Sequence, residues 1–177
     1  LQFNWLTITL GMGSMILAFA YPFMKRITYW PQLFLGLTFN WGILMGWTAI
    51  TNSMSIEPLV LYLAAIFWTL GYDTIYGLQD VSDDEVIGVK STSIKFKNNV
   101  KVFVGTCYSL CVVFILILCV IMEIDKYILA LSVFFISSFI YQLKIFKIDS
   151  PESCLTAFKA NNLTGIFIFV FIFSFIL

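Results

Sequence analysis

Apolar residues fill six long stretches of the chain, and short polar breaks separate these stretches. A helix needs about 20 mostly apolar residues to cross a membrane, and each stretch is close to that length. Pro22 and Pro31 flank the first expected turn, and Pro58 and Pro151 lie at later breaks. The pattern predicts one all-α transmembrane domain over residues 1–177, with helices at about 3–24, 32–50, 57–78, 100–122, 127–146 and 155–177.

The composition excludes an ordinary soluble domain. Of the 177 residues, 60% are hydrophobic and 11% are charged, whereas a soluble domain carries roughly 25% charged residues. We therefore expect a polytopic membrane protein whose surroundings are a lipid bilayer, and we expect no nucleic-acid partner. The four cysteines form no Cys-x-x-Cys pair and are best explained as small packing residues. Histidine is absent, so a metal would be bound by oxygen atoms, which suits Mg²⁺.

Basic residues predict how the helices are oriented. If six helices alternate, nine of the ten Lys and Arg residues lie on the side that holds the long connection 79–99, and Lys126 alone lies on the other side. The positive-inside rule makes the basic side cytoplasmic, or matrix-facing in a mitochondrion. The protein would then belong to a bacterial or mitochondrial inner membrane. Both ends of the sequence would lie on the outer side, which indicates that an odd number of helices precedes it.

Acidic residues concentrate in one segment, and five of the ten carboxylates fall between Asp73 and Glu85. Ionisable groups at a membrane boundary are costly and usually mark a functional site. On a continuous helix with 100° per residue, four side chains share a stripe about 80° wide: Asp73, Tyr76, Asp80 and Asp84. Such a stripe suits Mg²⁺ bridged to phosphate oxygens. Asp83 and Glu85 are more simply explained as solvated neighbours.

Two basic segments could bind the anion that such a site implies. Gly88-Val89-Lys90-Ser91-Thr92 offers a close backbone approach, an ammonium group and two hydroxyls, which together could hold a diphosphate. Lys25 and Arg26 belong to the same membrane face, and Arg26 is the one arginine of the sequence. A guanidinium group suits a carboxylate. Positive-inside placement explains these residues equally well without a ligand.

These segments resemble motifs of a known family. Tyr72-Asp73-x-x-Tyr76-x-x-x-Asp80-x-x-x-Asp84 with the following Gly-Val-Lys-Ser-Thr resembles the second aspartate-rich motif of the UbiA intramembrane prenyltransferases. Tyr21-Pro22-Phe23-Met24-Lys25-Arg26, with Pro31-Gln32 and Leu35-Gly36, resembles the branch that prenylates 4-hydroxybenzoate in ubiquinone biosynthesis. The last helix, with Ala157-Phe158-Lys159-x-Asn161-Asn162, is also similar to that branch.

The resemblance implies a bundle of nine helices in which Mg²⁺ and a polyprenyl diphosphate are held between two aspartate-rich motifs. An allylic carbocation-like species would then be attacked by the ring of 4-hydroxybenzoate, and pyrophosphate would leave. The implied catalytic residues are Asp73 and Tyr76, and the implied metal ligands are Asp80 and Asp84. The diphosphate would be bound by Lys25, Lys90, Ser91 and Thr92, and the aromatic substrate by Arg26 and Tyr21.

The sequence departs from the family in one respect, because the first aspartate-rich motif is absent. The six expected helices match the last six of the family's nine, so the sequence corresponds to a C-terminal fragment and holds half of the metal site. We therefore expect this chain alone to be inactive. Three alternatives remain: a family branch that uses another aromatic ring or a haem precursor, a cation transporter that uses the carboxylates, and a structural remnant.

Overall fold

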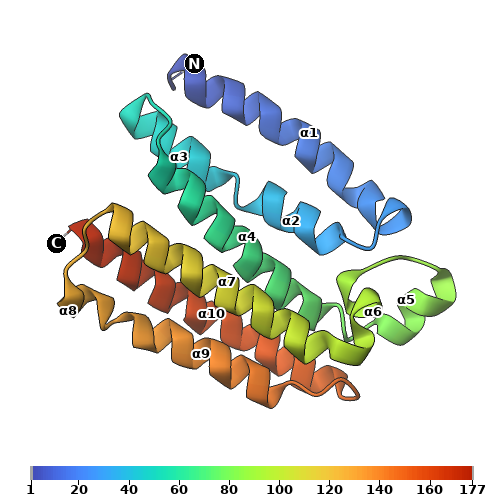
Figure 1. Cartoon of the computed structure of the whole chain (residues 1–177). Coiled ribbons are helices and arrows are strands. Elements are labelled where there is room, and N and C mark those ends of the chain that lie inside the picture. The colour runs from blue at the N-terminus through green and yellow to red at the C-terminus, as the bar shows by residue number, and fades with distance from the viewer. Residues whose placement is uncertain (1, 177) are drawn as a thin grey trace.

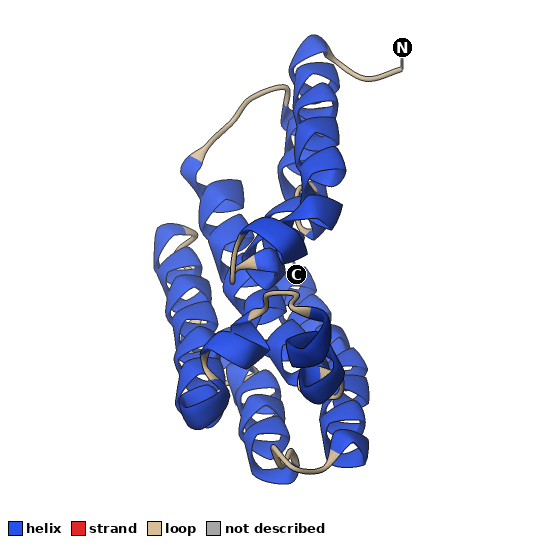
Figure 2. Cartoon of the chain, turned by 90° about the vertical axis from the view of Figure 1, so that its right-hand side faces the viewer, coloured by secondary structure: helices blue, strands red, loops and turns tan. Residues whose placement is uncertain are grey.

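The computed structural model describes residues 2–176, and every regular element in this part of the chain is a helix (Figures 1 and 2). The long helices are α1 (Trp5–Ile27), α4 (Ile56–Tyr76), α7 (Val100–Ile121) and α10 (Pro151–Phe173). Two further segments are broken rods, α2 (Pro31–Phe39) with α3 (Gly42–Thr51), and α8 (Lys126–Leu129) with α9 (Ser132–Ile145). The connection from α4 to α7 contains α5 (Val81–Ile87), α6 (Thr92–Lys95) and the 3₁₀ turn Lys97–Asn99, and a second 3₁₀ turn, Ser174–Ile176, follows α10.

Six segments of the described chain are long and apolar enough to cross a membrane. This confirms the predicted all-α membrane protein, although several helix boundaries differ. The prediction that Pro22 flanks the first turn is wrong, because α1 continues through Pro22 to Ile27. Proline is tolerated within membrane helices, where neighbouring groups and local adjustments satisfy the freed carbonyl.

The single helix predicted for residues 32–50 is also wrong, because the rod breaks at Asn40 and Trp41. Asn40 Nδ2 donates to the Gly36 carbonyl and to Thr69 Oγ1 of α4, both at 2.8 Å. Trp41 Nε1 donates to the Leu10 carbonyl of α1 at 2.9 Å. Side chains thus compete for hydrogen bonds around the break and attach it to helices on both sides.

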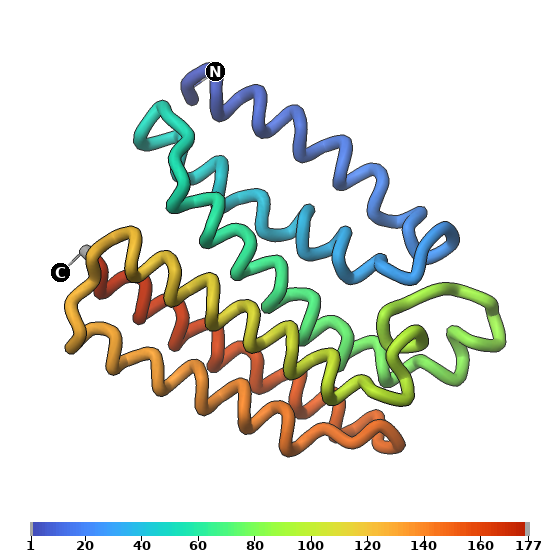
Figure 3. Tube along the Cα trace, viewed as in Figure 1, coloured from blue at the N-terminus to red at the C-terminus, as the bar shows by residue number. Residues whose placement is uncertain are grey.

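Helix α4 occupies the centre of the bundle and carries the longest set of buried residues. Helices α1 to α3 lie on one side of it, and α7, α9 and α10 lie on the other (Figures 1 and 3). Its most extensive contact is with α7. Lipid gives no hydrophobic drive for helices to associate, so close packing of small residues and interhelical hydrogen bonds decide which helices meet.

Gly71 of α4 packs closely against α7. A Cβ atom at this position would lie 2.5 Å from Cε1 of Tyr108 on α7. The tyrosine ring is fixed from its other end, because its hydroxyl donates to Gln142 Oε1 of α9 at 2.6 Å. Gln142 Nε2 in turn donates to Thr164 Oγ1 of α10 at 2.7 Å. The position of α4 two residues before Asp73 therefore depends on a glycine against an immobilised ring.

We expect Gly71→Ala to destabilise the protein by about 1–3 kcal/mol, the usual cost of overpacking a well-packed core. The measurement is thermal unfolding in detergent, followed by far-ultraviolet circular dichroism. Gly46→Ala is the matched control, because a Cβ at Gly46 would meet nothing within 4 Å. Equal melting temperatures for the two variants would contradict the role assigned to the contact between Gly71 and Tyr108.

Candidate active site

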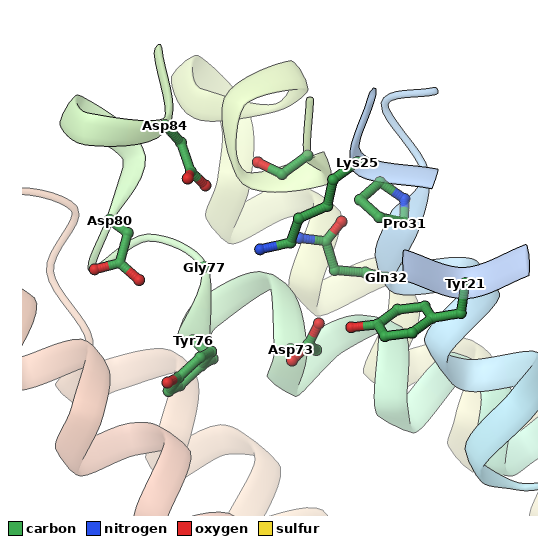
Figure 4. Close-up of a pocket in the computed structure, with 10 residues that line it drawn as sticks. Tyr21, Lys25, Pro31, Gln32, Asp73, Tyr76, Gly77, Asp80 and Asp84 are labelled. Atoms are coloured by element: carbon green, nitrogen blue, oxygen red, sulfur yellow. The ribbon is translucent and has the colours of Figure 1, made fainter. Parts of the chain in front are cut away.

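A pocket opens at the end of α4 where α1, α2, α5 and the α5–α6 connection meet (Figure 4). This site pocket collects side chains that lie far apart in the sequence. Its lining residues are Tyr21, Lys25, Pro31, Gln32, Asp73, Tyr76, Gly77, Asp80, Asp84 and Ser91. Seven of the ten sequence-predicted site residues are therefore brought together.

The acidic segment reaches the site pocket by bending, so the continuous helical stripe predicted for it is wrong. Helix α4 ends at Tyr76, a turn covers residues 77–80, and α5 begins at Val81. Gly77 permits this turn, because a Cβ there would lie 2.6 Å from Ser93 Oγ and 3.3 Å from Gln32 Nε2. The helix is interrupted here, yet the four predicted side chains still line one pocket (Figure 4).

Within residues 2–176, the structure shows no ion pair and no side-chain hydrogen bond for the carboxylates of this pocket. Asp80 is the N-cap residue of α5, yet its side chain makes no capping hydrogen bond. A capping aspartate normally stabilises a helix by about 1 kcal/mol, and here the carboxylate faces the pocket instead (Figure 4). In the part of the chain that the structure describes, the one ion pair joins Lys97 to Glu85, which lie outside the pocket. The pocket carboxylates are thus available to a ligand.

Oxygen ligands at this site fit Mg²⁺ held together with a phosphate. Asp80 and Asp84 lie in the same pocket, and the backbone N–H of Asp84 donates to the Asp80 carbonyl at 2.8 Å. No group of three His, Cys, Asp or Glu side chains among the described residues could hold a metal by itself. Mg²⁺ commonly uses one or two carboxylates and completes its shell with water and substrate phosphate. The two carboxylates are therefore suitable for Mg²⁺ that binds together with a phosphate ligand.

Helix α1 contributes two of its three predicted residues to the pocket. Tyr21 and Lys25 are one helical turn apart and both line it, and the Tyr21 hydroxyl is directed toward the Asp73 carboxylate (Figure 4). Arg26 follows Lys25 by 100° around the helix. It is exposed and is not among the lining residues. A direct contact between Arg26 and the aromatic substrate therefore stays a prediction.

The structure places Lys90 outside the pocket lining. Its Nζ donates to the Ile27 carbonyl at 3.3 Å and lies 5.6 Å from the centre of the Tyr29 ring. Its backbone N–H donates to the Lys25 carbonyl at 2.7 Å. In this position Lys90 ties the α5–α6 connection to the end of α1, and its contact with a diphosphate stays a prediction.

Ser91 and Thr92 have different positions although they are adjacent. Ser91 lines the pocket and caps α6, where its Oγ accepts from the Ile94 backbone N–H at 3.2 Å. Thr92 is fully buried behind the pocket and shares a 2.7 Å hydrogen bond with Thr74 Oγ1 of α4. Thr92 therefore supports the pocket wall, whereas Ser91 belongs to the surface of the pocket.

Three lining residues received no role from the sequence: Pro31, Gln32 and Gly77. Pro31-Gln32 belonged to the segment that resembles the family, but two residues at the start of a helix do not by themselves indicate a binding role. The one sequence signal for Gly77 is that a glycine interrupts the helical pattern of the acidic segment. Asn161 of α10 accepts from Trp68 Nε1 of α4 at 2.7 Å, so this part of the motif joins two helices.

Comparison with known proteins shows which family the sequence matches. The family model described as "UbiA prenyltransferase family" matches residues 1–174. A mitochondrial 4-hydroxybenzoate polyprenyltransferase of Aedes aegypti is 40% identical over 173 residues, which cover 96% of this chain and 39% of that protein. The human protein of the same name is 41% identical over 170 residues, which cover 94% of this chain and 45% of its own length. The Arabidopsis thaliana protein of this name is 53% identical over 104 residues, or 58% of this chain and 26% of that protein.

No solved structure matches the chain. The chain spans less than half the length of these curated relatives. The family match nevertheless covers both motif regions and all six apolar segments. On this evidence the chain belongs to the UbiA prenyltransferase family.

Proposed function

We propose that this chain forms part of the active site of a 4-hydroxybenzoate polyprenyltransferase that acts in ubiquinone biosynthesis. The observation that carries the proposal is the site pocket, where three carboxylates, a lysine and two tyrosines face one another at the end of an apolar bundle. Relatives that bear this name match nearly the whole chain. The remaining metal ligands would come from the first aspartate-rich motif, which this sequence lacks.

The donor would be a polyprenyl diphosphate with its anionic head in the site pocket. Lys25 would balance part of the diphosphate charge, and Asp80 and Asp84 would hold Mg²⁺ against its oxygens. Bound Mg²⁺ would neutralise the charge that grows on the departing diphosphate. The allylic C–O bond breaks in this step, and its electron pair leaves with the diphosphate.

The prenyl chain requires apolar surroundings, and the structure offers them in two adjoining pockets. Both are lined by Ile43, Leu61 and Ile172, between the α2–α3 rod, α4 and α10. The second reaches Trp68, which packs edge-on against Tyr72. Phe158 contacts both Tyr72 and Tyr76, and Tyr76 lines the site pocket. The two apolar pockets would suit a long isoprenoid donor.

Aromatic faces beside the diphosphate site would stabilise the carbocation-like species. The rings of Tyr76 and Phe158 have centroids 4.7 Å apart at the pocket edge, and a ring face attracts a cation. The ring carbon of 4-hydroxybenzoate next to the phenol carbon would form the new C–C bond. Asp73, which lines the site pocket, would accept the ring proton that is lost afterwards. Tyr21 lies beside Asp73, and Arg26 would have to turn inward to bind the benzoate carboxylate.

The membrane setting is part of the proposal. The connection that carries α5 and α6, and the ends of α1 and α9, lie at the same end of the bundle (Figure 1). This end would face the cytoplasm of a bacterium or the mitochondrial matrix, because basic residues favour that side. Transporters usually bind their ions near the membrane midplane, and the position of the site pocket at the end of α4 favours the transferase.

Mg²⁺-dependent binding of a non-reactive prenyl diphosphate analogue tests the metal site. Asp80→Ala and Asp84→Ala should each weaken this binding by about tenfold or more, because a charge-assisted contact is lost. Asp83→Ala is the matched control, since Asp83 is exposed on α5 and does not line the pocket. If the Asp83 variant loses as much affinity as the other two, the proposed metal ligands are wrong.

The purified chain should show no prenyl transfer when it is given donor, Mg²⁺ and 4-hydroxybenzoate, because it carries half of the implied metal site. Product formation can be followed by chromatography with a radiolabelled acceptor. Co-expression with the first three helices of a relative should restore turnover if the two parts assemble. Robust turnover by the chain alone would overthrow the half-site interpretation.

A further inference from the structure

Gln32 combines deep burial with access to the site pocket. It is the second residue of α2, and only 4% of its surface is exposed. It nevertheless lines the pocket together with Lys25, Asp73 and Asp80. The polar atoms of a buried carboxamide normally have hydrogen-bond partners. The oxygen and the nitrogen of Gln32 differ in this respect.

The oxygen end has a fixed partner. Gln32 Oε1 accepts from the backbone N–H of Thr92 at 2.9 Å. A backbone N–H can only donate, so the atom that faces it must be the carboxamide oxygen and not the nitrogen. The orientation of the amide is therefore decided by its surroundings, and Nε2 must be directed away from Thr92.

The nitrogen end faces the pocket. Nε2 would lie 3.3 Å from a Cβ built on Gly77, and Figure 4 shows the carboxamide nitrogen beside Lys25 and directed into the pocket. No hydrogen bond joins Nε2 to another described residue. The buried Gln142, by contrast, uses both ends, with Tyr108 as its donor and Thr164 as its acceptor.

We propose that Gln32 Nε2 donates hydrogen bonds to a phosphate oxygen of the ligand in the site pocket. The inference rests on the proposed function and adds a substrate-binding residue to it. Three carboxylates surround this space and would repel an anion that arrives without its cation. A neutral N–H donor attracts a phosphate oxygen without changing the charge that the metal ligands present. Since Oε1 is already used, Gln32 also links ligand binding to the start of α6.

The test is Mg²⁺-dependent binding of inorganic pyrophosphate, measured by calorimetry, to the chain co-expressed and purified with the first three helices of a relative. Gln32→Glu keeps an oxygen for the Thr92 N–H but replaces the donor with a carboxylate oxygen. We expect about a tenfold or greater loss of pyrophosphate affinity. Gln79→Glu is the charge-matched control. It adds the same charge close to Asp80, but Gln79 donates to the Tyr76 carbonyl and does not line the site pocket.

A second variant protects the test against a new metal ligand. Gln32→Met adds no charge and removes the donor, so it should lose pyrophosphate affinity as well. It also removes the oxygen that accepts from the Thr92 N–H, which Gln32→Glu keeps. Melting temperatures establish that each variant is folded. Loss of affinity in both Gln32 variants, with Gln79→Glu close to the unsubstituted chain, supports the inference.

Other outcomes separate this inference from the proposed function. If the unsubstituted chain binds pyrophosphate and the folded Gln32 variants bind it equally well, the inference is overturned while the metal site stands. If the variants lose affinity for 4-hydroxybenzoate alone, the donor faces the acceptor carboxylate and the inference is also overturned. If the unsubstituted chain, assembled with the first three helices of a relative, binds no pyrophosphate with Mg²⁺, the proposed site fails, and the inference fails with it.

Discussion

The site depends on a small buried network of polar groups behind the end of α4. Thr74 of α4 and Thr92 of α6 share a hydrogen bond of 2.7 Å, and Gln32 of α2 accepts from the Thr92 backbone at 2.9 Å. Ser93 Oγ donates to the Thr74 carbonyl at 2.8 Å. These contacts join three elements that apolar packing alone would not hold in one register, because lipid competes equally for apolar side chains. Together with the contact of Lys90 to the end of α1, they position the segment that carries Asp80 and Asp84.

A second constraint sets the position of α4 itself. The Tyr108 ring rests against Gly71, and its hydroxyl donates to Gln142 of α9, which in turn donates to Thr164 of α10. Asp73 follows Gly71 by two residues, so this packing helps to position the acidic end of α4. A rigid scaffold that supports a ligand-binding turn is the usual arrangement for a functional site. Here the rigid part lies on the α7 side, and the ligand-facing groups lie on the α1 and α2 side.

The side chain of Asp80 faces the pocket and does not cap its own helix. An aspartate at the N-cap would normally satisfy a backbone N–H of its own helix. In this structure that hydrogen bond is not made, and the charge is kept for the pocket. Helix α5 therefore lacks the stabilisation of an N-cap hydrogen bond, and the surrounding polar network stabilises this part of the chain instead. Such local exceptions are typical of functional sites. The same reasoning applies to Gln32, whose one end is used for structure while the other faces the pocket.

The sequence by itself determined the class of the protein, the six membrane segments and the residue types of the site, because hydrophobic length and clustered charge are local properties. It could not locate the break at Asn40, where the competing acceptors come from Thr69 and the Gly36 backbone. It placed Asp73, Asp80 and Asp84 on one helical stripe, whereas a bend at Gly77 brings them together. Only the tertiary structure showed that Arg26 and Lys90 lie outside the pocket lining and that Gln32 lies within it. Those outcomes depend on contacts between residues far apart in the sequence, which no local pattern encodes.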